Sequence, residues 1–175
     1  MITFETLTTW MTAPTETEHL EFKEARNQFD ATKLVNYCCA LANECGGHLV
    51  LGVTDRLPRR VVGTTAFGNL PEIKLLLLQK LRLRVEVDEL AHPDGHVFVF
   101  TVPSRPIGMP IATNGTYCMR AGESLVAMSP DHLQRIFAEG VPDFSASTCT
   151  AATMADLAPQ AIERFRRLWE IRQPA

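Results

Sequence analysis

The sequence lacks any apolar run of the ~18 residues that a membrane-spanning helix needs, which excludes a membrane span. Its opening residues, MITFETLTTW, have neither the basic nor the apolar segment of a secretory leader, so we expect a cytoplasmic protein. Basic residues are also scarce: 17 Lys and Arg stand against 20 Asp and Glu, for a formal net charge of −3. Because nucleic-acid-binding proteins usually carry a basic excess, any phosphate contact here must come from a local cluster of cations.

Several common functional motifs are absent as well. The sequence has no GxxxxGK[S/T] and no GxGxxG after a predicted strand, so neither common nucleotide-binding fingerprint is present. It has no HExxH and no GxSxG, which removes support for a zinc protease or a serine hydrolase. The five cysteines form no CxxC pair, and this argues against both a disulfide framework and a structural zinc site.

The patterns that are present predict an α+β domain with a mixed, largely antiparallel sheet and flanking helices. Helical spacing of apolar residues predicts helices over 30–45, 69–82 and 129–139, with Asp30 and Ser129 as N-caps. Alternating or continuous apolar residues predict strands at 19–24, 48–55, 84–90, 96–102 and around 115–120, with a further short strand at 61–62. The turn HPDG between 84–90 and 96–102 predicts that these two strands pair antiparallel.

Composition divides the chain into three segments. Residues 1–140 hold the regular patterns and form the predicted domain. Residues 141–155 are small, polar and weakly patterned, which is typical of a linker. Residues 156–175 predict an amphipathic helix whose apolar stripe needs a partner.

The stretch ETEHLEFKEA, residues 16–25, gathers carboxylates and a lysine around two apolar residues. In a strand, Leu20 and Phe22 face the core, while Glu21 and Lys23 project together on the other side. One interpretation is a half-exposed strand with a polar face. The other is a site for a cation and a phosphate, and it requires the chain to turn or bulge near residue 17 or 18 so that Glu16 joins Glu21.

A third carboxylate follows the apolar strand that ends in GVTD. Asp55 lies where this strand emerges into a loop, a usual position for a functional side chain. Glu16, Glu21 and Asp55 together would offer hard oxygen ligands, which suit Mg²⁺ or Mn²⁺, and Lys23 could hold a phosphate beside them.

Taken in order, five segments resemble the Schlafen AlbA_2 domain family: ETEHLEFKEA, ALANECGGHLVLGVTD, VVGT, TVPSRPIGMPI, and GTYCMRAGES with MSPDHLQRIF. The resemblance spans roughly residues 5–140. In family members of the nuclease type, two such lobes surround structured RNA, and a metal site of two glutamates and an aspartate cuts tRNA or rRNA.

For this chain the resemblance implies a divalent-metal-dependent endoribonuclease acting on structured RNA. Glu16, Glu21 and Asp55 match the metal-binding acids, and Lys23 matches the lysine that contacts the phosphate. The cations expected to hold the nucleic-acid backbone are Lys23, Arg59, Arg60, Arg105 and Arg120. Because one lobe cannot surround an RNA, a homodimer is implied.

The family also implies an alternative. In many bacterial members the domain is a DNA-binding part of a transcriptional regulator, and cleavage is not implied there. The tail MADLAPQAIERFRRLW resembles the stretch that follows the domain in such regulators. The alternative is therefore a non-catalytic module that binds DNA or senses a ligand.

Overall fold

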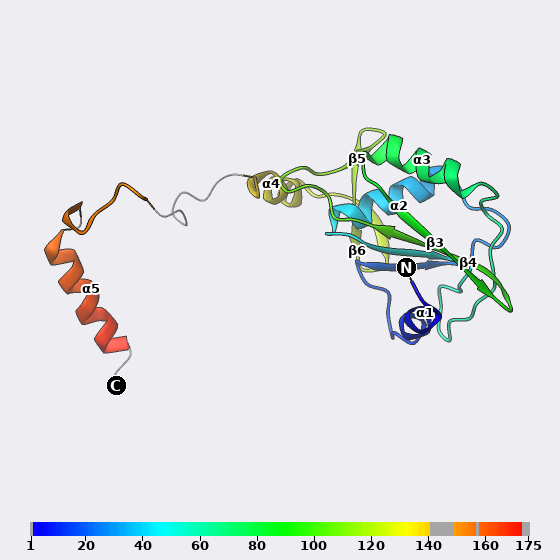
Figure 1. The fold of residues 1–175 in the computed structure, drawn as a ribbon, viewed down its shortest axis with the longest axis horizontal. Helices are drawn as coiled ribbons and strands as arrows, with labels where there is room; N and C mark the ends of the chain where they lie inside the picture. Colours follow the sequence, from blue (N-terminus) through cyan, green and yellow to red (C-terminus); the bar gives the residue numbers. More distant parts are fainter. Residues whose placement is uncertain (1, 141–148, 157, 173–175) are drawn as a thin grey trace. The chain divides into compact units, whose positions relative to one another are not determined.

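The protein divides into two units, residues 1–141 and 142–175, which we describe separately (Figure 1). The computed structural model describes residues 2–140, 149–156 and 158–172. No helix in these ranges is both long and apolar enough to cross a membrane.

The first unit is built on a four-stranded sheet in the order β1-β2-β4-β3. Its strands are β1 (Leu20–Lys23), β2 (Gly47–Leu51), β4 (Gly95–Val102) and β3 (Glu86–His92). The β1–β2 pair is parallel, and the β2–β4 and β3–β4 pairs are antiparallel. The predicted α+β class, with a mixed, largely antiparallel sheet, is confirmed.

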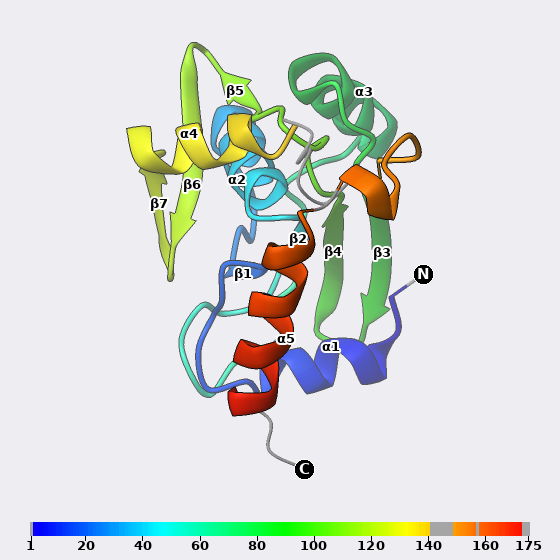
Figure 2. The ribbon, with the colours of Figure 1, turned by 90° about the vertical axis from the view of Figure 1, so that its left-hand side faces the viewer.

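Helices cover both faces of this sheet (Figure 2). Helix α1 (Phe4–Met11) packs Leu7 against Phe22 and Val50 on one face. Helices α2 (Ala31–Asn43) and α3 (Leu70–Leu81) cover the other face, where Leu49 and Phe100 join their core. Because Glu21 pairs with Leu49 across the parallel strands, Glu21 and Lys23 face α2.

Helix boundaries follow the capping residues expected from the sequence. The Asp30 carboxylate accepts a hydrogen bond from the Lys33 amide at 2.8 Å and starts α2. The Ser129 hydroxyl accepts one from the His132 amide at 3.2 Å and starts α4 (Pro130–Ala138). Both N-caps are therefore confirmed, because each side chain satisfies an amide that the first helical turn leaves without a partner.

A second, three-stranded sheet packs against α2. It consists of β5 (Ala112–Thr113), β6 (Thr116–Ala121) and β7 (Ser124–Ala127), in that order. The sequence indicated β6 but neither of its neighbours, nor helix α1. The strand predicted at 61–62 was wrong: this segment forms only one isolated bridge, between Val53 and Val61.

The double glycine after α2 is a packing site. Gly46 has φ +93°, a conformation that glycine adopts at little cost. A Cβ added to Gly47 would lie 2.4 Å from the carbonyl oxygen of His19, which accepts a hydrogen bond from the His48 amide. Gly47 therefore lets the chain leading into β1 approach the start of β2, and Gly46 lies against the end of β4 at Val102.

The second unit contains helix α5 (Pro159–Arg172) and a 3₁₀ turn at Met154–Asp156. Phe165 and Trp169 lie one turn apart on α5, with ring centroids 5.9 Å apart. Residues 141–148 of the predicted linker 141–155 lie outside the described residues, as do 157 and 173–175 of the predicted terminal segment.

Candidate functional site

Glu21 and Lys23 share one face of β1, and this face is covered. The Glu21 side chain is 0% exposed and that of Lys23 is 23% exposed. The second sheet and α2 supply the covering groups, among them Arg120 from β6 and Tyr37 from α2. The interpretation of residues 19–24 as a half-exposed strand with a polar outer face is therefore wrong for Glu21.

Glu16 reaches the same place through a tight turn. Thr17 and Leu20 form an antiparallel bridge, and the chain reverses between them. The Glu16 carboxylate then accepts a hydrogen bond from the Phe22 amide at 3.0 Å. The turn required near residue 17 or 18 is thus present, and it brings Glu16 beside Glu21.

Arg120 is the buried counter-charge of these glutamates. Its guanidinium is 0% exposed and directly contacts the carboxylate of Glu21, while Glu16 Oε2 lies 3.9 Å away. Arg120 was expected to contact the nucleic-acid backbone. Its burial corrects that expectation, because a guanidinium enclosed by protein cannot reach a phosphate.

Lys23 joins Glu21 to Asp55. Its ammonium lies 2.7 Å from Glu21 Oε1 and donates a hydrogen bond to Asp55 Oδ2 at 2.9 Å. The Asp55 side chain is 43% exposed, so it forms the outer edge of the group. We call these five side chains, Glu16, Glu21, Lys23, Asp55 and Arg120, the carboxylate cluster.

The carboxylate cluster does not fit a divalent cation as it is arranged. Three carboxylates are the right ligand type for Mg²⁺ or Mn²⁺. However, the described residues contain no group of three or more Asp, Glu, His or Cys side chains placed to hold a metal ion. The Lys23 ammonium stands between Glu21 and Asp55, where a shared cation would lie.

Two further arginines expected to bind nucleic acid have partners inside the protein. Arg59 is 8% exposed, donates to the carbonyl oxygens of Met11 and Ala13, and lies over the ring of Phe22 at 4.6 Å. It therefore ties the segment after α1 to β1. Of the predicted arginines on this loop, only Arg60 is exposed.

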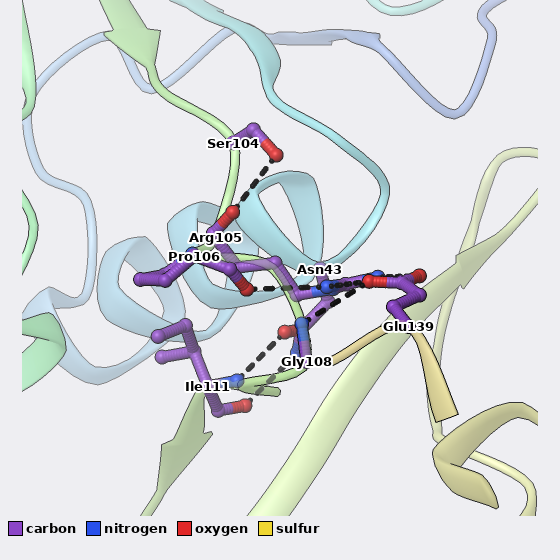
Figure 3. A network of polar contacts seen from close by, with 7 residues as sticks. All are labelled: Asn43, Ser104, Arg105, Pro106, Gly108, Ile111 and Glu139. Carbon is purple, nitrogen blue, oxygen red and sulfur yellow. Dashed lines mark hydrogen bonds and ion pairs between the residues drawn. The ribbon is translucent and has the colours of Figure 1, made fainter. Parts of the chain in front are cut away.

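Arg105 belongs to the network of polar contacts in Figure 3. It forms a two-pronged ion pair with Glu139, with N–O distances of 2.7 and 2.6 Å. This pair holds the pKa of Glu139 down at about 2. Arg105 therefore fastens the end of α4 to the loop before β5, and its role is structural.

Two open cavities lie on either side of the Lys23–Asp55 pair. One, of about 560 Å³, extends toward Gln28 and Phe29, and the other, of about 350 Å³, extends toward Glu16 and Glu123. Lys23, Asp55 and Arg56 line both. Arg56 was missing from the predicted contacts, although its place directly after Asp55 was a signal for it.

Burial gives Glu16 an unusual titration. The pKa of this carboxyl is raised from 4.5 to about 7, chiefly because burial disfavours its charged form and also because of a hydrogen bond with Glu21. The folded protein therefore keeps a proton that the unfolded chain releases. Such a group contributes stability that is present below the unfolded pKa and is lost as the pH rises through the folded value.

We expect the substitution Glu16→Gln to remove the loss of stability that accompanies a rise in pH. Between about pH 5 and about pH 8 the wild type should lose up to about 3 kcal/mol of unfolding free energy relative to the variant. Urea unfolding at both pH values measures the difference. Exposed Glu18 supplies the control, because Glu18→Gln should lose as much unfolding free energy between the two pH values as the wild type does. A Glu16→Gln variant that shows the same loss as the wild type contradicts the prediction.

Comparison with known proteins places the carboxylate cluster inside a recognised domain. A family model described as Schlafen, AlbA_2 matches residues 16–129, a range that contains all five residues of the cluster. No curated protein matches the chain.

Two solved structures are similar to the chain. The DIP2311 protein from Corynebacterium diphtheriae is 18% identical with a TM-score of 0.57, and the match covers 92% of this chain and 37% of that one. The other is the N-terminal domain of a protein from Nitrosomonas europaea, described as related to the ATP-dependent DNA helicase RecG. It is 23% identical with a TM-score of 0.49, and the match covers 71% of this chain and 92% of that one. The likeness to DIP2311 shows a shared fold, and this chain spans little more than a third of that protein's length.

Proposed function

Because the chain belongs to the Schlafen AlbA_2 family, which suggests a nucleic-acid-binding domain, we propose that it binds nucleic acid around Arg56 and Arg60. One observation carries this proposal. Both side chains are exposed, and neither forms an ion pair with any residue that the structure describes. Arg56 lines both cavities that flank the Lys23–Asp55 pair, and Arg60 lies at the end of the same loop.

The loop between these arginines is held at both ends. The Thr54 hydroxyl accepts a hydrogen bond from the Arg60 amide at 2.9 Å, and the Thr54 amide donates to the Arg60 carbonyl at 3.0 Å. The two guanidinium groups therefore come from a closed loop next to Asp55. A phosphate backbone lying across this loop would meet both of them, with Lys23 below.

Few cations contribute, so we expect binding that is weak and strongly salt-dependent. Each phosphate contact adds about 0.7 to the slope of log affinity against log salt for a single strand, and about 0.9 for a duplex. The double substitution Arg56→Ala/Arg60→Ala should lower this slope by about 1.4 for single-stranded RNA. Fluorescence anisotropy over a range of salt concentrations measures it.

Arg84 offers a control that removes the same kind of charge. It is exposed and precedes β3, whose first residue, Glu86, pairs with Thr101 of β4. Thr101 in turn pairs with His48 at the start of β2, whereas Arg56 and Arg60 follow the end of β2. Arg84→Ala should leave the slope unchanged. A double variant that keeps the wild-type slope would place the phosphate contacts elsewhere.

A second candidate function is a divalent-metal-dependent endoribonuclease that cuts structured RNA such as tRNA. Glu16, Glu21 and Asp55 would be the acids of its site, with Lys23 beside the phosphate. The specific support is the gathering of the acids: Glu16 turns back beside Glu21, and Lys23 links Glu21 to Asp55. Both oxygens of Glu21 already contact a cation, so a divalent ion could enter only if the Lys23 ammonium moved away.

Incubation of the protein with total tRNA, in Mn²⁺ or in EDTA, tests this candidate. Wild type is compared with Asp55→Ala and with Glu123→Ala, which removes another acid from the rim of the smaller cavity. Discrete fragments that require both Mn²⁺ and Asp55 establish the nuclease. Intact tRNA in every reaction contradicts it and leaves the binding module, for which a titration with duplex DNA is the next measurement.

The nuclease candidate includes a homodimer, because a single domain of this size cannot enclose a folded RNA. Two copies would face a shared groove, each with its own carboxylate cluster. Sedimentation velocity with and without tRNA distinguishes a dimer from a monomer.

A further inference from the structure

The larger of the two cavities beside Lys23 has an aromatic wall. It lies between the segment after β1, which contributes Gln28 and Phe29, and the segment after β2, which contributes Thr54 and Arg56. Its volume is about 560 Å³ and it opens to solvent. Neither Gln28 nor Phe29 takes part in the carboxylate cluster.

Two aromatic rings, those of Tyr37 and Phe67, pack against Phe29 and restrict its motion. Its ring lies 6.4 Å from that of Tyr37 and 6.5 Å, edge to face, from that of Phe67. Phe67 in turn packs edge to face on Phe100 of the central sheet, at 6.2 Å. A ring fixed in this way loses little conformational entropy when a flat ligand stacks on its remaining surface.

Charges around the cavity cancel. Lys23 and Arg56 on its wall are balanced by Glu24 and Asp55, which also line it. The cavity therefore attracts no net anion, and a phosphate group is a poor occupant. An uncharged flat group whose phosphates remain outside, near Arg56 and Arg60, suits it better.

Gln28 adds a group that can form hydrogen bonds with such a ligand. Its side chain is exposed, and its amide forms no hydrogen bond within the described residues. A glutamine amide offers both donors and an acceptor, as the edge of a nucleobase requires.

We propose that this cavity holds an unpaired base of a single-stranded segment, stacked on Phe29 with its edge toward Gln28. The inference rests on the proposed function, because the phosphates on either side of the base are those held by Arg56 and Arg60. It assigns the domain a single-stranded or locally opened target, since a base paired in a duplex is not free to enter.

The test compares two fluorescein-labelled oligomers of ~10 nucleotides, one carrying bases and one with every base removed, at low salt. The first oligomer is prepared in both ribose and deoxyribose forms, which reveals any preference for one sugar. Wild type should bind the base-bearing oligomer about 5- to 100-fold more tightly than the abasic one, the range expected for stacking on one aromatic ring. Phe29→Leu, which keeps an apolar side chain at this position, should lose most of that preference and bind the abasic oligomer as the wild type does.

Two further variants complete the design. Phe4→Leu removes an exposed ring from α1, on the opposite face of the sheet, and should bind both oligomers like the wild type. Gln28→Ala changes an exposed side chain that the fold does not need, and it should reduce discrimination among oligo-A, oligo-C and oligo-U.

The outcomes separate the two proposals. If the wild type binds both oligomers equally, or if Phe29→Leu weakens both to the same extent, the base site is overturned while nucleic-acid binding stands. If neither oligomer binds at low salt and duplexes do not bind either, the proposed function fails and the base site fails with it.

Discussion

Replacing Arg120 with alanine is expected to destabilise the domain by about 3–5 kcal/mol, the usual cost of breaking a buried ion pair by removing one partner. The Glu21 carboxylate is 0% exposed and would lose the guanidinium that contacts it. Glu16, which is 8% exposed, would lose its weaker interaction with the same guanidinium, which lies 3.9 Å from Glu16 Oε2. Urea unfolding followed by circular dichroism measures the change.

Arg135 provides the matched control for this substitution. It forms an ion pair with Asp131 at 2.9 Å on α4, but both side chains are more than 70% exposed. Arg135→Ala should therefore cost less than about 0.5 kcal/mol. Equal losses of unfolding free energy from Arg120→Ala and Arg135→Ala would show that the buried ion pair contributes no more to stability than the exposed one.

The double substitution Glu21→Gln/Arg120→Met tests the physical cause. It removes both charges and keeps the side-chain volumes similar. Removing both charges leaves no buried charge without its partner, and replacing a buried ion pair by hydrophobic residues of similar volume is often neutral or stabilising. The double variant should thus recover most of the stability that Arg120→Ala loses.

The second large effect is expected at Asn43, the last residue of α2 (Figure 3). Its side-chain amide donates to the carbonyl oxygens of Ile111 and Cys118, at 2.9 and 2.8 Å, and its oxygen accepts from the Ile111 amide at 2.8 Å. This one buried side chain thereby satisfies backbone groups of Ile111, which precedes β5, and of Cys118, which lies in β6. No neighbouring side chain replaces it fully, although the Cys39 thiol also donates to the Ile111 carbonyl.

Asn43→Leu keeps the approximate size of the side chain and removes all three hydrogen bonds. Leaving a buried polar group without a partner costs about 1–3 kcal/mol, so we expect a loss of about 3 kcal/mol or more. Thermal and urea unfolding check this, with exposed Asn27→Leu as the control. A variant as stable as the wild type would mean that water replaces the amide.

Most of the fold could be predicted because its signals are local. Asp30 and Ser129 cap helices within their own segments, and the HPDG turn lies between the two strands it joins. Helix α1 was missed because FETLTTWM contains three threonines and buries only Leu7, so its periodicity is weak. Strand β5 has two residues, too few to show alternation.

The candidate site was harder to predict because its partners are distant in sequence. The spacing of Glu16, Glu21 and Lys23 indicated that they would gather, and the turn at Thr17 brings them together. Nothing in the local pattern distinguishes an arginine that holds a phosphate from one that neutralises a buried acid. Arg120 therefore looked like a surface cation until β6 placed it against Glu21.

The pairing of Glu21 with Arg120 also has a consequence for biosynthesis. Glu21 and Lys23 leave the ribosome early, but the second counter-charge of Glu21, the fully buried Arg120, arrives only with β6, after the whole central sheet has been made. Until then the nascent chain can bury the Glu21 carboxylate only against Lys23, which leaves part of the desolvation penalty uncompensated. The site is thus completed late in translation, and a chain interrupted before β6 should remain incompletely folded and open to proteolysis.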